Sequence, residues 1–249
     1  SKNAVIILSG RSLPFYFSDW KKLVVQPLSQ SVIEHQMQDT DLPPTLLHLL
    51  ERPMMLSLAL KQKSTENSLT DNLTETQLID MFVQNSLKKT AERLNCQDIV
   101  GDTLSMLQEL ANVSYQSMEI DRNYKNERML AINAGILQEA MLSTEYNRYE
   151  FTHELFHTFF SARNIMISLK HLNSNIKPNI QFMDEQLISN QLIQYCAELI
   201  TESNLIACLS SLRKNGHPWL VANLVKMLQY IRPLGKEGSL NAVDLSYLD

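Results

Sequence analysis

Residues 149–162 have the sequence YEFTHELFHTFFSA, and the interpretation of the whole chain depends on this stretch. Its first four residues alternate in polarity, which is typical of a strand, and the later residues are apolar at helical spacing. The same stretch contains His153-Glu154-x-x-His157, which is the H-E-x-x-H pattern of zinc hydrolases. Two hypotheses follow: a strand that leads into a buried helix, or a zinc site on the first turns of that helix.

A zinc site would use both histidines, because residues four apart lie on the same face of a helix. His153 and His157 would bind the metal, and Glu154 would act on a water molecule as general base. A third ligand is needed, and the downstream candidates are His171 and Glu185. The motif lies at the start of its helix, however, and four phenylalanines crowd the segment, which favours a core helix. A zinc-dependent hydrolase is therefore the alternative hypothesis, and both histidines could also be structural.

The composition is that of a folded chain with a sizeable core. Of the 249 residues 44% are apolar and 20% charged, and the net charge of -5 gives no electrostatic reason to bind nucleic acid. The three cysteines form no C-x-x-C pair, so we expect a reducing, cytoplasmic environment. Since no run of about 18 apolar residues and no secretory signal is present, no membrane partner is expected.

Residues 4–8, AVIIL, predict a buried strand of the parallel type, and Arg11 follows its end. Open α/β sheets bind ligands at this position, although a solvated loop arginine is the simpler alternative. A single strand of this kind needs hydrogen-bonded neighbours. The chain begins at Ser1 without an initiator Met, so we expect it to be a piece of a longer protein.

Helical periodicity dominates the rest of the sequence. It predicts a helix over residues 30–38, then a helical run from residue 45 that Pro53 kinks or divides. Thr74 and Gln77 match a capping box for a helix that ends near Leu94. A further helix carries Leu104, Leu107, Leu110 and Ala111 on one face.

A β-hairpin is expected in the middle of the chain. A short helix over residues 127–133 stops at Gly135, where glycine can adopt the left-handed cap. Residues 136–142 and 149–152 then predict two strands, and a helix to about Leu169 follows. Helices, a hairpin and a closing helix form a winged-helix layout.

The C-terminal part is predicted to be helical over residues 184–201, 203–213 and 218–231. The expected fold class is mainly α: a helical bundle, a winged-helix domain with a small β-hairpin and a C-terminal helical stack. The expected domains are residues 1–22 (the end of a nucleotide-binding core), 23–98 (helical), 99–172 (winged helix) and 173–249 (C-terminal helices).

Several segments, in order along residues 4–165, resemble the NACHT and related STAND-class signalling NTPases, which are relatives of the AAA+ ATPases. Residues 5–12, VIILSGRS, resemble the sensor-1 strand and its arginine, and residues 25–29, VQPLS, resemble the segment that joins that core to the helical domain. Residues 50–56, LERPMML, resemble a proline-centred motif of that domain. Residues 133–137 and 149–162 are similar to the winged-helix domain.

The resemblance implies a regulated switch in which ATP or ADP, with Mg²⁺, lies between the nucleotide-binding core and the helical domains. It assigns the γ-phosphate contact to Arg11, packing near the base to Pro53, and a contact with the β-phosphate of ADP to His153. Glu51 stands where the family pattern often has glycine. The chain has no G-x-x-x-x-G-K-[ST] loop and no acidic strand before Ala4. We therefore expect no catalytic residues, no resident metal and no bound nucleotide in this chain alone.

The resemblance also implies partners. They would be the rest of the same polypeptide, or further copies of the chain that assemble on activation during signalling, for example in innate defence. The C-terminal helices could bind a protein ligand.

Overall fold

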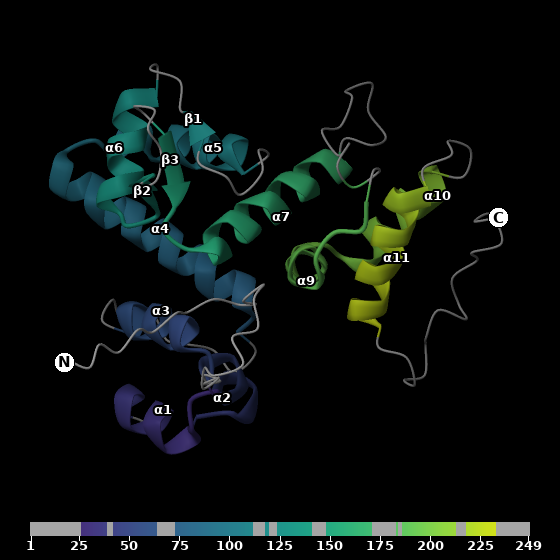
Figure 1. The fold of residues 1–249 in the computed structure, drawn as a ribbon, viewed down its shortest axis with the longest axis horizontal. Helices are drawn as coiled ribbons and strands as arrows, with labels where there is room; N and C mark the ends of the chain where they lie inside the picture. The colour runs from purple at the N-terminus through teal and green to yellow at the C-terminus, as the bar shows by residue number, and fades with distance from the viewer. Residues whose placement is uncertain are drawn as a thin grey trace, which may run out of the picture.

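The computed structural model describes residues 26–38, 42–63, 73–111, 118–119, 124–140, 148–170, 183, 186–212 and 218–232. The predicted strand at residues 4–8 and Arg11 lie outside these ranges. The described residues are mainly helical, as predicted (Figure 1). The elements are α1 (Gln30–Met37), α2 (Pro44–Leu50), α3 (Pro53–Lys63), α4 (Glu75–Leu94), η1 (Gln97–Ile99), α5 (Val100–Leu110), β1 (Met118–Glu119), α6 (Lys125–Asn133), β2 (Leu137–Glu139), β3 (Arg148–Phe151), α7 (Glu154–Lys170), α9 (Asn190–Leu199), α10 (Glu202–Ser211) and α11 (Pro218–Ile231).

Two predicted helix boundaries are confirmed in the N-terminal part. Helix α2 ends at Leu50 and α3 begins at Pro53, because proline fits the first turn, where its missing N–H is not needed. At the start of α4, Thr74 Oγ1 accepts a hydrogen bond from the N–H of Gln77 at 3.3 Å. The side chain of Gln77 in turn accepts from the N–H of Thr74 at 2.9 Å, which completes the capping box.

The predicted hairpin is confirmed, and a third strand joins it. Strands β2 and β3 are antiparallel, with Leu137 opposite Phe151. Strand β1 pairs with the other edge of β3, which gives the order β1-β3-β2. The sequence did not predict β1, because two residues are too few for an alternating pattern. Gly135, which follows α6, has the expected positive φ of 73°.

Helix α7 is the core helix that the apolar interpretation of residues 149–162 predicts. Phe156, Phe159 and Phe160 are all buried. The ring of Phe160 stacks on Phe151 of β3 at 5.8 Å, and Phe156 stacks on Phe82 of α4 at 5.6 Å between ring centroids. Aromatic packing therefore joins α7 to the sheet on one side and to α4 on the other.

The C-terminal helices form a group in which α9 packs on α7 and α11, and α10 packs on α11 (Figure 1). The prediction of a helix from residue 184 is wrong, since α9 begins only at Asn190, after its N-cap Ser189. The reason is Asn223 of α11, which is fully buried. It accepts a hydrogen bond from the N–H of Ile188 at 3.1 Å and donates to the carbonyl of Gln186 at 2.9 Å. These bonds engage the backbone before α9 in a non-helical conformation.

None of the helices in the described ranges has the length and apolar character that spanning a membrane requires.

Candidate functional site

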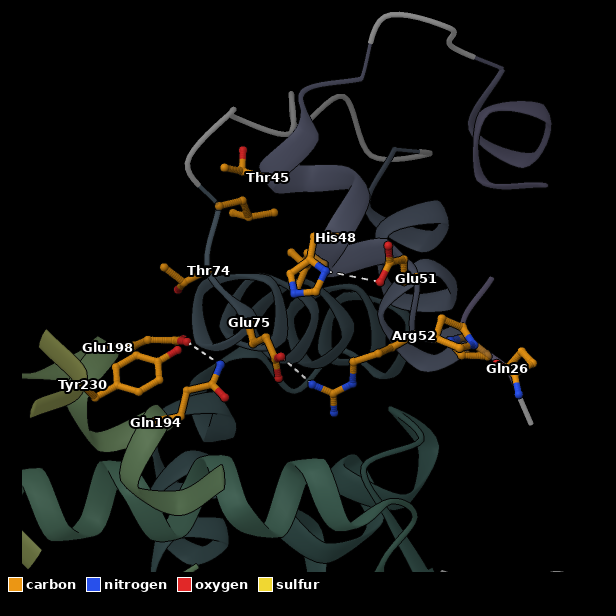
Figure 2. A pocket seen from close by; sticks show the side chains of 14 residues that line it. Gln26, Thr45, His48, Glu51, Arg52, Thr74, Glu75, Gln194, Glu198 and Tyr230 are labelled. Atoms are coloured by element: carbon orange, nitrogen blue, oxygen red, sulfur yellow. Dashed lines mark hydrogen bonds and ion pairs between the residues drawn. The ribbon is translucent and has the colours of Figure 1, made fainter. Parts of the chain in front are cut away.

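An open cleft of about 550 Å³ lies between the starts of α3 and α4 on one side and helices α9 and α11 on the other (Figure 2). The chain reaches this place from three distant segments, because α3 packs on α2 and on α4, and α9 packs against the same helix α4. The described residues that line the cleft are Gln26, Pro27, Thr45, His48, Leu49, Glu51, Arg52, Pro53, Leu73, Thr74, Glu75, Gln194, Glu198 and Tyr230.

Pro53, which the sequence singled out, lines this cleft as the first residue of α3. Its neighbours Glu51 and Arg52 line it as well. The carboxylate of Glu51 lies 3.2 Å from Nδ1 of His48, and the guanidinium of Arg52 forms an ion pair with Glu75 (Figure 2). The proline therefore lies beside a polar surface in which most charged groups already have partners.

The charges of the cleft favour some ligands over others. Among the described lining residues, one arginine stands against three glutamates, Glu51, Glu75 and Glu198, so the formal charge is negative with His48 neutral. A multiply charged phosphate chain placed here would be repelled. An uncharged ring, or a group with hydroxyl donors that carboxylates can accept from, fits this surface better.

Four residues connect the start of α4 to α9, and we call them the α4–α9 clamp: Glu75, Thr76, Tyr195 and Glu198. The hydroxyl of Tyr195 donates to Glu75 at 2.9 Å, and the backbone N–H of Thr76 donates to Glu198 at 3.0 Å. Each helix therefore supplies one carboxylate to the other. Burial, followed by the charge of Glu75, raises the pKa of Tyr195, so that this phenol stays protonated and remains a donor.

The sequence did not predict this clamp. Glu75 is an ordinary acidic residue in a first helical turn, where negative charge is favourable. Its partner Tyr195 lies 120 residues further along the chain. The sequence pattern at Glu75 is explained by the helix alone, because an acidic residue in the first turn is favourable without any distant partner.

His153 occupies the position before α7, and its ring caps that helix. The Nδ1 atom accepts a hydrogen bond from the backbone N–H of Leu155 at 3.1 Å. A neutral ring that accepts at Nδ1 carries its hydrogen on Nε2. The ring therefore satisfies one of the N–H groups at the start of α7 by itself.

The structure describes two of the three predicted nucleotide-contact residues, and it does not place those two in one cavity. Pro53 lines the cleft, His153 is absent from the described residues that line it, and Arg11 lies outside the described residues.

The zinc hypothesis has no third ligand in the described part of the chain. The His157 ring meets Phe151 edge-on, with 5.7 Å between the centroids, at the margin of the aromatic core. Within the described ranges, no group of three His, Cys, Asp or Glu side chains is placed to hold a metal ion. The two candidates for the third ligand, His171 and Glu185, lie outside those ranges.

Comparison with known proteins gave no relative: no protein-family model, no curated protein and no solved structure matches the chain. The functional conclusion therefore depends on the residues and their geometry.

Proposed function

We propose that this chain is the regulatory part, helical and winged-helix, of a nucleotide-dependent signalling switch of the NACHT/STAND class. The observation that carries the proposal is the place of Pro53. The one proline that the sequence motif assigns to nucleotide recognition is the first residue of α3 and lines an open cleft of about 550 Å³. A cleft of this size is in the range of small-molecule and cofactor sites.

The arrangement around α7 gives further support. Helices α5 and α6 precede the β2–β3 hairpin, and α7 follows it directly. This is the order of elements in the winged-helix layout, and His153 stands at its last junction, between β3 and α7.

The charges of the cleft define how a nucleotide would lie. In this proposal the base packs beside Pro53, and the ribose hydroxyls donate to the glutamates of the cleft. The phosphates lie outside the cleft, together with Mg²⁺, near the nucleotide-binding core and Arg11. The Nε2–H of His153 then donates to the β-phosphate of ADP, because Nδ1 is engaged with Leu155.

The test uses the natural gene product that contains this chain and measures ADP affinity by fluorescence titration. His153→Asn is the informative variant, because asparagine is a good helix cap but removes Nε2. We expect it to weaken ADP binding about tenfold, as for loss of one hydrogen bond to a charged group, with only a small change in melting temperature. Pro53→Ala should weaken binding of ADP and of adenosine alike, since it acts on the base.

His153→Ala is the companion variant, because it removes the cap and the Nε2 donor together. It should lower both affinity and melting temperature. A natural gene product that binds neither ADP nor ATP would contradict the proposal, and unchanged affinity in His153→Asn would remove His153 from it.

A further inference from the structure

Helix α9 joins the C-terminal helices to the rest of the molecule through two unlike contacts. Toward α7 the helix packs along an extensive contact, and α9 buries the apolar side chains Ile193, Cys196 and Ala197. Helix α10 is also held near α7, since the thiol of Cys208 lies 3.8 Å from the carbonyl of Leu169. Toward α4 it consists of the α4–α9 clamp, at the first turn of that helix. The clamp borders the cleft, while the contact with α7 lies away from it.

We propose that the α4–α9 clamp is a latch that holds helices α9 to α11 as a movable wall of the cleft, and that its opening widens the cleft and speeds the entry of a ligand. The identity of that ligand as a nucleotide depends on the proposed function, whereas the latch itself does not. Glu198 and Gln194 of α9 and Tyr230 of α11 belong to the movable wall, and Arg52 and Pro53 belong to the opposite one (Figure 2).

The hydrogen bonds of the clamp suit a contact that opens. When α9 moves away, Glu75 keeps its ion pair with Arg52. Glu198 keeps the hydrogen bond that Gln194 donates from one turn earlier on the same helix, at 2.9 Å. The N–H of Thr76 is buried and loses its carboxylate, but Glu198 lines the cleft, so water can take its place once α9 has moved. Because no charge is left buried and unpaired, opening avoids the large cost of breaking a buried ion pair.

The geometry also couples the two hydrogen bonds of the latch. Tyr195 and Glu198 are three residues apart and share one face of α9, and their partners Glu75 and Thr76 are consecutive in the first turn of α4. Both bonds are therefore made or lost by the same small displacement of α9. The contact of α9 with α7 can act as the pivot, as in a hinged closure around a ligand.

The test is amide hydrogen exchange of the natural gene product, in the wild type and in Tyr195→Phe and Glu198→Ala. Tyr195→Phe removes the hydrogen bond to Glu75, and Glu198→Ala removes the acceptor for the N–H of Thr76. We expect exchange in the first turn of α4 and along α9 to rise about tenfold, with exchange in α7 unchanged. Tyr124→Phe is the matched control, because it also removes a hydrogen bond from a tyrosine hydroxyl to a glutamate, Glu109, away from the clamp and from the residues that line the cleft. It should leave exchange in α4 and α9 as in the wild type.

Two results would overturn the latch. One is exchange at α4 and α9 that equals the wild type in both clamp variants. The other is exchange that rises equally in α7, which would make the clamp an ordinary part of the global fold.

ADP binding kinetics decide the gating claim separately. If the latch admits ligand, the clamp variants should bind ADP faster than the wild type and Tyr124→Phe. Equal association rates, with an open clamp seen by exchange, would overturn gating while the proposed function stands. If ADP binds no form of the protein, the proposed function fails, and the exchange data still decide the latch.

Discussion

The first turns of α4 and α7 find acceptors for their backbone N–H groups in two different ways. Both helices expose backbone N–H groups that need acceptors. At α7 the acceptor is local, since the ring of His153 binds the N–H of Leu155, two residues away. At α4 the local box of Thr74 and Gln77 is joined by Glu198, which lies 122 residues beyond Thr76. A local cap only starts a helix, whereas a distant carboxylate also determines which part of the molecule lies beside it.

The two helix starts also have different surroundings. Beneath α7 lie packed aromatic rings, and beside α4 lies an open, polar cleft. Apolar burial stabilises one arrangement strongly, while the part-buried hydrogen bonds at the start of α4 contribute a smaller net amount, because water at the polar cleft can replace them. We therefore expect the region of α7 to be the rigid part and the start of α4 to be the adjustable part.

The largest effect is expected for Phe160→Ala, which tests whether α7 is the rigid part. Phe160 is fully buried and lies against the rings of Phe151 and Phe159. Its truncation should lower the free energy of unfolding by about 3–5 kcal/mol, measured by urea denaturation. Trp219→Ala is the control, because this side chain is 45% exposed, and it should cost far less. A loss below about 1 kcal/mol for Phe160→Ala would mean that α7 is not the rigid part.

High pH should weaken the apolar side of α9. Burial raises the pKa of the Cys196 thiol, so it stays protonated in the folded chain while the unfolded chain ionises near its ordinary pKa of about 8.5. Since the folded state then binds more protons, stability falls as pH rises. Between pH 8 and 10 the loss should be on the order of 2 kcal/mol from this thiol.

Urea denaturation at several pH values measures this loss, and the variant Cys196→Ala should show a flatter profile. A variant with the same slope as the wild type would show that Cys196 is not the cause.

On the polar side, Glu198→Ala should lower stability by about 1 kcal/mol, since the N–H of the buried Thr76 loses its acceptor while water can still reach the cleft. Glu198→Gln should cost less, because an amide oxygen can still accept. Thermal unfolding of both variants measures the difference. If the two variants lose the same amount, charge at the start of α4 contributes more than the hydrogen bond does.

Substitutions of His153, the local cap of α7, should lower stability least. His153→Ala should cost about 1 kcal/mol, and His153→Asn a few tenths, because asparagine restores an acceptor for the N–H of Leu155. Melting temperatures of the two variants test this order. If asparagine is as destabilising as alanine, the imidazole has a packing role that the cap does not explain.

Features set by neighbouring residues could be predicted from the sequence. The capping box of α4, the break at Pro53, the left-handed Gly135 and the hairpin all follow from short patterns. The late start of α9 was missed, because Asn223 imposes it from 35 residues away. The α4–α9 clamp was missed for the same reason. Of the candidate site, Pro53 and the neighbouring Glu51 were identified by their motif, and Glu75 and Glu198 were not.

The most direct test of the central claim is hydrogen exchange of the natural gene product with and without ADP. Our account predicts protection at two places, residues next to Pro53 at the start of α3 and the first turn of α7 after His153. It also predicts that His153→Asn removes the second protection and keeps the first. ADP binding that protects neither helix start would contradict the account, because the nucleotide would then lie away from both of the residues that the proposal assigns to it.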